Sequence, residues 1–227
     1  MCVALAKHGV DHTNIQWIRA TLEGRLATAT LGGFSRSVEV SRGYPQGGVL
    51  SPLLWCLVVD ELIARLNMGG VYTQGYMDDI CLLAVGKFPN TVSGLIQWAL
   101  HTVEVWCDED RVLVNPDKTG HVAFTRRRKL PGFLEPCLFG MTLRRSILVK
   151  YLGVILVSRL TWREHMDVKL RKAHNLLWAC RNACGMTWGL TPKVGHWLYV
   201  SIIRPSITFA PLVWWPGCQT AIATKKN

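Results

Sequence analysis

Acidic residues are few in this sequence. Its 227 residues include 15 Asp and Glu against 26 Lys and Arg, so the formal net charge is +11. A charge of this size attracts polyanions and makes their binding sensitive to salt concentration. The composition therefore predicts a nucleic-acid partner. Because 49% of the residues are hydrophobic, it also indicates a folded chain and excludes a disordered one.

Long apolar runs are also absent. Residues 49–59 are too few to cross a membrane, and residues 202–215 are interrupted by Arg204, Pro205 and Pro211. A membrane-spanning helix needs about 20 consecutive apolar residues. We also find no signal peptide, internal repeat or low-complexity tract. These absences predict an intracellular globular protein without a membrane partner, long enough for one domain or for a core with an appendage.

Cysteine pairs at zinc-ligand spacing are missing too, apart from Cys180 and Cys184. These two lie on one face of a predicted helix and could hold half of a zinc site, but no second pair has the required spacing. The eight Cys residues are scattered through apolar stretches. We interpret them as reduced thiols packed in the core, not as a disulfide framework.

The stretch around which the chain is organised is Val71 to Val85, which contains the pair Asp78-Asp79. Residues 76–79 should form a turn, and the apolar run after them predicts a strand buried on both faces. Two adjacent carboxylates at the tip of such a hairpin repel each other unless a cation neutralises them, and hard oxygen ligands select Mg²⁺ or Mn²⁺. The alternative is ordinary turn chemistry, since Asp is common in turns.

Three further blocks accompany this pair: Arg-Gly-Tyr-Pro-Gln-Gly-Gly at residues 42–48, Asn-Pro-Asp-Lys-Thr at 115–119 and Tyr-Leu-Gly-Val at 151–154. In the first block Pro45 restricts the backbone while Gly47 and Gly48 remove side chains, so a nucleotide or template base could approach the main chain closely. The alternative is an ordinary strand-to-helix turn.

Periodicity and turn residues predict the elements of the first half. We expect the end of a helix at residues 3–7, a helix at 14–22, a hairpin of 26–31 with 35–41 around Gly32-Gly33, a helix capped by Ser51 and running to about 66, an amphipathic helix marked by Leu95, Ala99, Val103 and Trp106, and short strands at 112–114 and 121–124.

Residues after 156 are predicted to form helices. A capping box at Thr161 to Glu164 opens a helix that Gly185 ends, with Met166, Leu170, Ala173, Leu177, Cys180 and Cys184 on its apolar face. Thr191-Pro192 opens another helix, ended by Arg204-Pro205. Its inward residues should be Val194, Trp197, Leu198 and Ile202.

In this order the four blocks resemble the reverse transcriptase of non-LTR, LINE-like retrotransposons, and the resemblance covers nearly the whole chain. It implies an α+β fold: a partial right-hand polymerase palm, built as a split βαβ unit with a ferredoxin-like sheet, followed by a helical thumb. Residues 1–156 would then be partial fingers and palm, and residues 157–227 the thumb and the start of a connection region.

The resemblance also implies an RNA-directed DNA polymerase that acts by two-metal nucleotidyl transfer with Mg²⁺ or Mn²⁺. Its partners would be an RNA template, a DNA primer and dNTPs, and its place of work nuclear DNA. The sequence leaves the oligomeric state open. One departure is Met77, where LINE-like enzymes more often carry Ala.

Site residues follow from the same resemblance. Asp78 would bind the metals directly with Asp79 beside it, and Lys118 would donate a proton to the pyrophosphate leaving group unless it is a solvated turn residue. Nucleotide and template contacts would come from Tyr44, Pro45, Gln46, Gly47, Tyr76 and Met77. Residues 151–156 resemble the hairpin that grips the primer, with Tyr151, Leu152 and Gly153 as the primer grip. Lys169, Arg171, Lys172 and Arg181 lie on the basic face of the first thumb helix and would follow a nucleic-acid backbone, unless that face is merely solvated.

One catalytic residue that the resemblance implies has no counterpart here. A further aspartate belongs on a strand before the first helix, whereas Asp11, Glu39 and Asp60 are predicted in a turn, on an edge strand and on a helix. We expect the chain to begin just after that strand. Two alternatives to an incomplete polymerase therefore stay open: a non-catalytic nucleic-acid-binding relic, and a gene-model product that does not fold stably.

Overall fold

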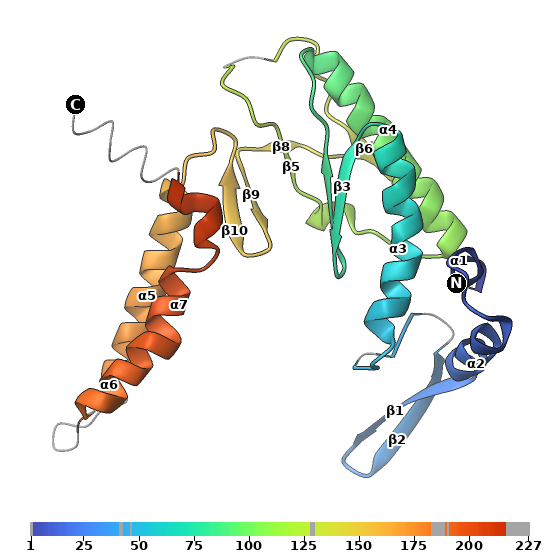
Figure 1. The fold of residues 1–227 in the computed structure, drawn as a ribbon, viewed down its shortest axis with the longest axis horizontal. Coiled ribbons are helices and arrows are strands. Elements are labelled where there is room, and N and C mark those ends of the chain that lie inside the picture. Colours follow the sequence, from blue (N-terminus) through green and yellow to red (C-terminus); the bar gives the residue numbers. More distant parts are fainter. Residues whose placement is uncertain are drawn as a thin grey trace. The chain divides into compact units, whose positions relative to one another are not determined.

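The computed structural model describes residues 2–40, 43–45, 47–127, 130–182, 189 and 191–216. It divides into two compact units: Met1–Pro116 with Leu130–Leu143, and Asp117–Lys129 with Arg144–Asn227 (Figure 1). Within the described residues, no helix has both the length and the apolar character needed to cross a membrane.

The first unit contains four helices and three hairpins among its described residues. Its elements are α1 (Cys2–Lys7), α2 (His12–Leu22), β1 (Arg25–Leu31), β2 (Phe34–Val40), α3 (Ser51–Met68), β3 (Tyr72–Tyr76), β4 (Asp79–Leu83), α4 (Pro89–Asp110), β6 (Cys137–Leu138) and β7 (Met141–Thr142).

The main core of this unit lies between α3, α4 and the β3–β4 hairpin (Figure 1). Apolar residues at helical spacing on α3, such as Val58, Leu62 and Leu66, pack against Ala99, Val103 and Trp106 of α4. The predicted amphipathic helix is therefore confirmed, because Ala99, Val103 and Trp106 are buried in this core as their spacing predicts.

Local turn chemistry explains the start of the chain. Gly9 and Gly24 follow α1 and α2 with positive φ, as helix C-terminal glycines do. Asp11 caps α2 by accepting a hydrogen bond from the Thr13 amide at 2.8 Å, which holds the pKa of its carboxyl below the usual value. The β1–β2 hairpin is confirmed, with both residues of its Gly32-Gly33 turn at positive φ.

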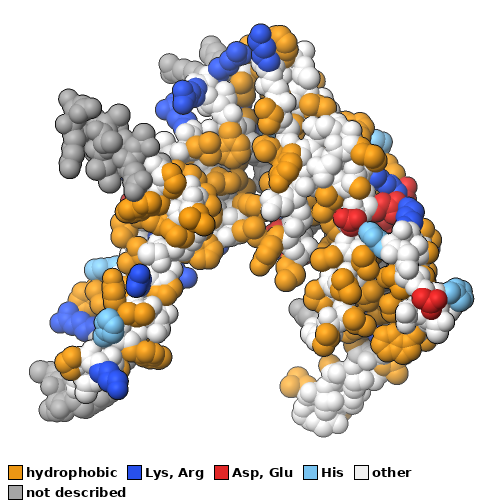
Figure 2. Space-filling view, viewed as in Figure 1, with side chains coloured by type: hydrophobic (Ala, Val, Ile, Leu, Met, Phe, Trp, Pro, Cys, Tyr) orange, Lys and Arg blue, Asp and Glu red, His pale blue; other side chains and the backbone are white. Residues whose placement is uncertain are grey.

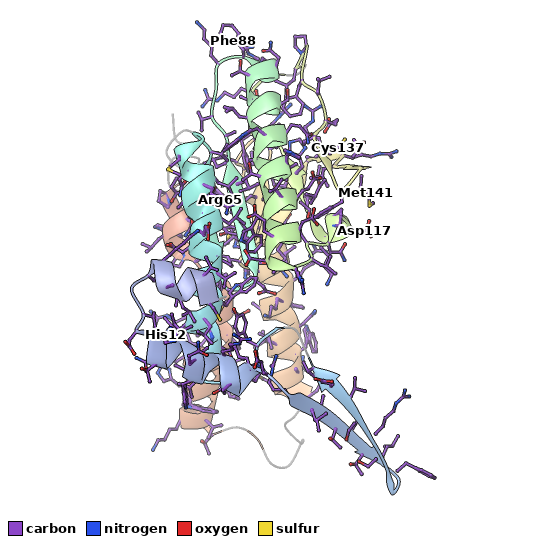
Figure 3. The ribbon with its side chains drawn as sticks, turned by 90° about the vertical axis from the view of Figure 1, so that its right-hand side faces the viewer. His12, Arg65, Phe88, Asp117, Cys137 and Met141 are labelled. Atoms are coloured by element: carbon purple, nitrogen blue, oxygen red, sulfur yellow. The ribbon has the colours of Figure 1, made fainter. Side chains whose placement is uncertain are left out.

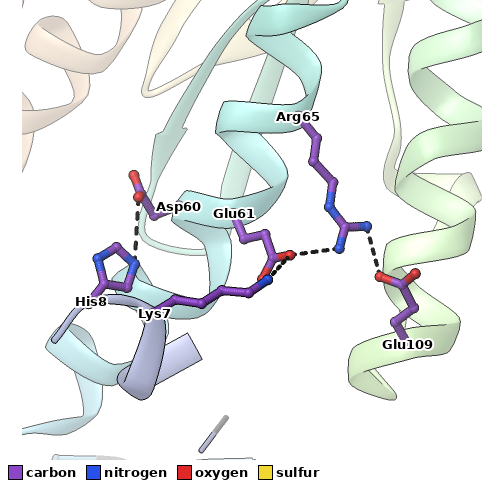
Figure 4. A network of polar contacts seen from close by, with 6 residues as sticks. All are labelled: Lys7, His8, Asp60, Glu61, Arg65 and Glu109. Carbon is purple, nitrogen blue, oxygen red and sulfur yellow. Dashed lines mark hydrogen bonds and ion pairs between the residues drawn. The ribbon is translucent and has the colours of Figure 1, made fainter. Parts of the chain in front are cut away.

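Ion pairs link α1, α3 and α4 on the surface (Figure 4). Glu61 accepts from Lys7 and from Arg65, each at 2.7 Å, and Arg65 also reaches Glu109 at 2.8 Å. The two hydrogen bonds hold the pKa of the Glu61 carboxyl below its usual value. Because every partner is at least a quarter exposed, the network contributes little to stability.

The short β6–β7 hairpin lies against α4, on the side where Figure 3 labels Cys137 and Met141. The Gln97 side chain takes the place of a neighbouring strand: its amide donates to the Cys137 carbonyl at 3.1 Å and accepts from the Cys137 amide at 2.8 Å. Leu138 and Leu143 pack beneath it on Leu100.

The second unit combines short strands with helices in its described residues. Its elements are β5 (His121–Val122), β8 (Arg145–Ser146), β9 (Leu148–Tyr151), β10 (Val154–Val157), α5 (Arg163–Asn182), α6 (Pro192–Leu198), a π-helical turn (Tyr199–Ile203) and α7 (Arg204–Ile207), and the 3-10 turn Pro116–Lys118 leads into it.

The mixture of helices and strands confirms the α+β class, but each sheet in the described residues has only two strands, so no ferredoxin-like sheet forms among them. The prediction of a strand over residues 80–85 buried on both faces is wrong. β4 ends at Leu83, which is 42% exposed, and Val85 is 82% exposed. Among the described strands β4 pairs only with β3, and this two-stranded sheet packs on α3 and α4 through Ile80 and Leu82 without burying the residues that follow them.

The apolar face predicted for α5 is also partly wrong. Leu170 and Leu177 are 51% and 54% exposed, whereas Ala173 is buried as predicted and His165, which was not predicted, is buried with it. The buried side of the helix contacts β10 and α7. Cys184 and Gly185, predicted on and at the end of this helix, lie outside the described residues.

Arg204-Pro205 does not end the following helix, contrary to prediction. The chain widens into the π-helical turn before it and continues as α7, with Pro205 in the first turn of α7. The wider turn accommodates the proline ring, which has no amide to donate to the preceding turn. Two of the predicted inward residues, Val194 and Trp197, are 41% and 60% exposed. Thr191 caps α6 as predicted, accepting from the Val194 amide.

His165 should make the second unit sensitive to acid. Its ring is fully buried, and Nδ1 accepts from the Ile155 amide at 3.1 Å. Burial, and then the charge of Lys169, lower its pKa from the ordinary value of 6.5. The unfolded chain therefore takes up this proton at higher pH than the folded one, so stability is lost as pH falls through and below about 6.5.

We expect the variant His165→Asn to lose less thermal stability than the parent between pH 8 and pH 5, because Asn keeps an acceptor near Nδ1 but does not titrate. The measurement is the melting temperature of both proteins across this range. An equal loss in both would show that His165 is not a source of the acid sensitivity.

Candidate functional site

The aspartate pair lies at the β3–β4 turn, where prediction put it. Tyr76 pairs with Asp79, so Met77 and Asp78 are the two turn residues, and Met77 has a φ of 53°. Positive φ suits the tight turn of a hairpin, but a residue with a Cβ atom pays roughly 1–2 kcal/mol for it. The strained turn exposes Asp78 at the tip and Asp79 at the start of β4.

The hairpin lies close to α3. A Cβ atom on Gly75 would come within 3.2 Å of the Ile63 side chain, so glycine allows β3 to approach the helix here. The indole Nε1 of Trp55 on α3 donates to the Met77 carbonyl at 2.6 Å. Sequence reasoning missed Trp55, because a tryptophan on an apolar helix indicates only core packing.

The donor set of the turn fits a hard cation. The four carboxylate oxygens of Asp78 and Asp79 are the ligand type that Mg²⁺ and Mn²⁺ prefer, and both residues are exposed. The described part of the chain brings no group of three or more His, Cys, Asp or Glu side chains together in a way that could hold a metal. The turn alone supplies two carboxylates.

The block before α3 forms a turn that Ser51 holds. The Ser51 hydroxyl donates to the Pro45 carbonyl at 2.7 Å, so Ser51 does not cap the helix as predicted. It is the first helical residue, and Leu50 occupies the cap position. Gly47 has a φ of 83°, as the predicted close turn requires. Gln46 lies outside the described residues.

Tyr44 lines a cavity of about 620 Å³ together with Trp55, Arg19, Arg111 and Asp110. Burial, and then the negative charge of Asp110, raise the pKa of the Tyr44 hydroxyl to about 12. Tyr44 therefore stays protonated at neutral pH. Trp55 lines this cavity with Tyr44 and also donates a hydrogen bond to Met77. One side chain of the first unit therefore contacts both the cavity and the aspartate turn.

Lys118 and the predicted primer grip belong to the second unit. Lys118 is exposed at the end of a 3-10 turn. Tyr151 to Gly153 end β9 and form the turn of the predicted hairpin, with Leu152 and Gly153 both at positive φ. Tyr151 is half-buried, and Gly153 lies close to the Phe209 ring. Their functional roles stay predictions.

The basic residues of α5 do not all face solvent. Arg171, Lys172 and Arg181 are exposed, and Figure 2 shows Lys and Arg side chains among apolar ones over the helices of this unit. The prediction is wrong in placing Lys169 with them. Its Nζ lies 4.0 Å from the centre of the Phe209 ring, and burial, then the charges of Lys172 and Lys150, lower its pKa.

Comparison with known protein families matches residues 2–156 to the family described as reverse transcriptase (RNA-dependent DNA polymerase). The RNA-directed DNA polymerase from mobile element jockey of Drosophila funebris is 30% identical over an alignment of 219 residues that covers 90% of this chain and 23% of that protein. Two proteins of Drosophila melanogaster are also similar. The probable RNA-directed DNA polymerase from transposon BS is 28% identical, over 82% of this chain and 20% of that protein. The probable RNA-directed DNA polymerase from transposon X-element is 26% identical, over 90% of this chain and 23% of that protein. The chain thus spans less than a quarter of the length of these relatives.

Proposed function

Because the chain belongs to the reverse transcriptase family, and specifically resembles the non-LTR retrotransposon enzymes, we propose that it supplies the palm and thumb of an RNA-directed DNA polymerase. Residues 1–156 would be partial fingers and palm, and residues 157–227 the thumb and the start of a connection region. The observation that carries the proposal is the exposed Asp78-Asp79 pair at a strained hairpin tip inside the matched region.

The proposed reaction is transfer of a nucleotide from a dNTP to the 3′-hydroxyl of a DNA primer on an RNA template. Asp78 would hold the divalent cations directly with Asp79 beside it. When bound, Mg²⁺ or Mn²⁺ lowers the pKa of the attacking hydroxyl and neutralises charge on the triphosphate. Lys118 would donate a proton to the pyrophosphate leaving group, and we propose nuclear DNA as the place of work.

The remaining proposed contacts surround the bound nucleic acid. Tyr44 to Gly47, including Gln46, would meet the nucleotide and template together with Tyr76 and Met77, and Tyr151 to Gly153 would grip the primer. Arg171, Lys172 and Arg181 of α5 would follow the phosphate backbone. Their exposure and positive charge support this last assignment.

Binding of an RNA–DNA hybrid should weaken steeply with salt, and Lys172→Gln should reduce the slope of log affinity against log salt by about one. Lys169→Gln is the matched control, because Lys169 stands over the Phe209 ring and should leave the slope unchanged. Fluorescence anisotropy with a labelled hybrid over a series of salt concentrations gives both slopes. A flat salt response of the parent chain would argue against any nucleic-acid role.

Primer extension tests the catalytic proposal. The substrate is a DNA primer on an RNA template, with dNTPs and Mg²⁺ or Mn²⁺. We expect an N-terminally extended form, which adds the strand and aspartate that the family resemblance implies, to extend the primer faster than the chain itself.

A second candidate is a non-catalytic nucleic-acid-binding protein that retains the polymerase fold. The observation that favours it is that the described residues add no third carboxylate, His or Cys to the aspartate turn. Salt-sensitive binding of the hybrid by both forms, without extension by either, would support this candidate over the polymerase.

A further inference from the structure

We propose that Trp55 is a positioning residue for the aspartate turn: its indole N–H holds the Met77 carbonyl and thereby fixes the direction in which Asp78 is presented to a divalent cation. This inference rests on the proposed metal-binding role of Asp78. Packing of Trp55 among the apolar residues of α3 would not by itself require an N–H donor at this position.

The backbone of the aspartate turn is strained. Met77 has a φ of 53°, which is unfavourable for a residue with a Cβ atom, so contacts elsewhere must hold the turn in this conformation. The Met77 carbonyl and the Asp78 amide belong to one planar peptide group. A hydrogen bond of 2.6 Å to that carbonyl therefore orients the backbone from which the Asp78 side chain extends.

The Trp55 indole, which donates this hydrogen bond, is held by the core. Trp55 packs edge-on against Trp106, with ring centroids 6.4 Å apart and an angle of 66° between the ring planes. Trp106 is 1% exposed and belongs to the main core with Val58 and Val59. A side chain anchored in this way can restrain a surface turn, which a mobile donor could not.

Substitution of Trp55 can separate its hydrogen bond from its packing. A Phe side chain at position 55 would keep an aromatic ring against Trp106 but would lack the N–H donor. Trp106 offers a matched control, because its own Nε1 is buried and meets no hydrogen-bond partner in the described part of the chain. Trp106→Phe therefore removes an indole from the same core without removing a hydrogen bond.

The experiment measures Mn²⁺ binding by the parent chain, Trp55→Phe, Trp106→Phe and Asp78→Asn, using electron paramagnetic resonance to count free Mn²⁺. Loss of one hydrogen bond predicts about fivefold weaker binding for Trp55→Phe. The Mn²⁺ affinity of Trp106→Phe should stay within about twofold of that of the parent chain. Asp78→Asn should lose the site.

Equal Mn²⁺ affinity of Trp55→Phe and the parent would overturn the inference and leave the proposed function standing. No Mn²⁺ binding by the parent would overturn the proposed metal site, and the inference with it. Should Trp55→Phe not fold, the parent labelled with ¹⁵N-tryptophan decides. Its Trp55 indole signal, assigned through contacts with the Trp106 ring, must shift when Mg²⁺ is added, and an unmoved signal would refute the role.

Discussion

Replacing Asp78 by Asn is expected to lower RNA-templated nucleotide incorporation by about a thousandfold, because it removes the charge of the proposed metal ligand, and such a ligand contributes several kcal/mol. Asn has nearly the same shape as Asp and tolerates turns equally well, so the hairpin should keep its conformation. Asp79→Asn should have a smaller effect, since Asp79 is proposed to lie beside the cations. The measurement is single-nucleotide incorporation by whichever form of the chain extends primers.

Asp60→Asn is the matched control for this experiment. Asp60 is an exposed acid of α3 whose Oδ2 lies 3.7 Å from the His8 Nε2, and it has no part in the proposed site. The incorporation rate of the Asp60→Asn variant should stay within about twofold of the parent rate, as expected for a surface substitution. Full activity of Asp78→Asn would mean that the aspartate turn does not bind the catalytic metals.

Trp106→Ala is expected to lower the free energy of unfolding of the first unit by about 4 kcal/mol, because it leaves a large cavity in the main core. Trp106 is 1% exposed and is surrounded by buried residues of α3 and α4. The free energy of unfolding of a typical domain is only about 5–15 kcal/mol, so this substitution would remove a large part of the stability of the first unit. Urea unfolding followed by circular dichroism measures it.

Trp17→Ala provides the control, because Trp17 on α2 is 59% exposed. The same change of residue type there should alter stability by about 0.5 kcal/mol or less. If the two variants were equally stable, the core between α3 and α4 would not be what holds the first unit together.

Local sequence signals predicted most of the elements correctly. The spacing of Ala99, Val103 and Trp106 predicted α4, and Gly32-Gly33 predicted the β1–β2 turn, because helical periodicity and positive φ are properties of neighbouring residues. The order of the four blocks was enough to recognise the family, which the family comparison confirms.

Contacts between distant residues were not predictable in the same way. The spacing that identified α5 as a helix did not reveal which of its faces is buried, because that depends on where β10 and α7 lie. Lys169 was therefore assigned to the solvated face, although it stands over Phe209, and Leu170 to the core, although it is exposed.

The sequence by itself thus determined the family, individual elements such as α4 and the β1–β2 hairpin, and the position of Asp78 and Asp79 at a turn, since each depends on residues close together in the chain. Only the tertiary structure decided that Trp55 reaches Met77, 22 residues further along, and that Trp106 supports it. The physical reason is that a hydrogen bond between two elements requires both to be packed in place, and no local pattern records that packing.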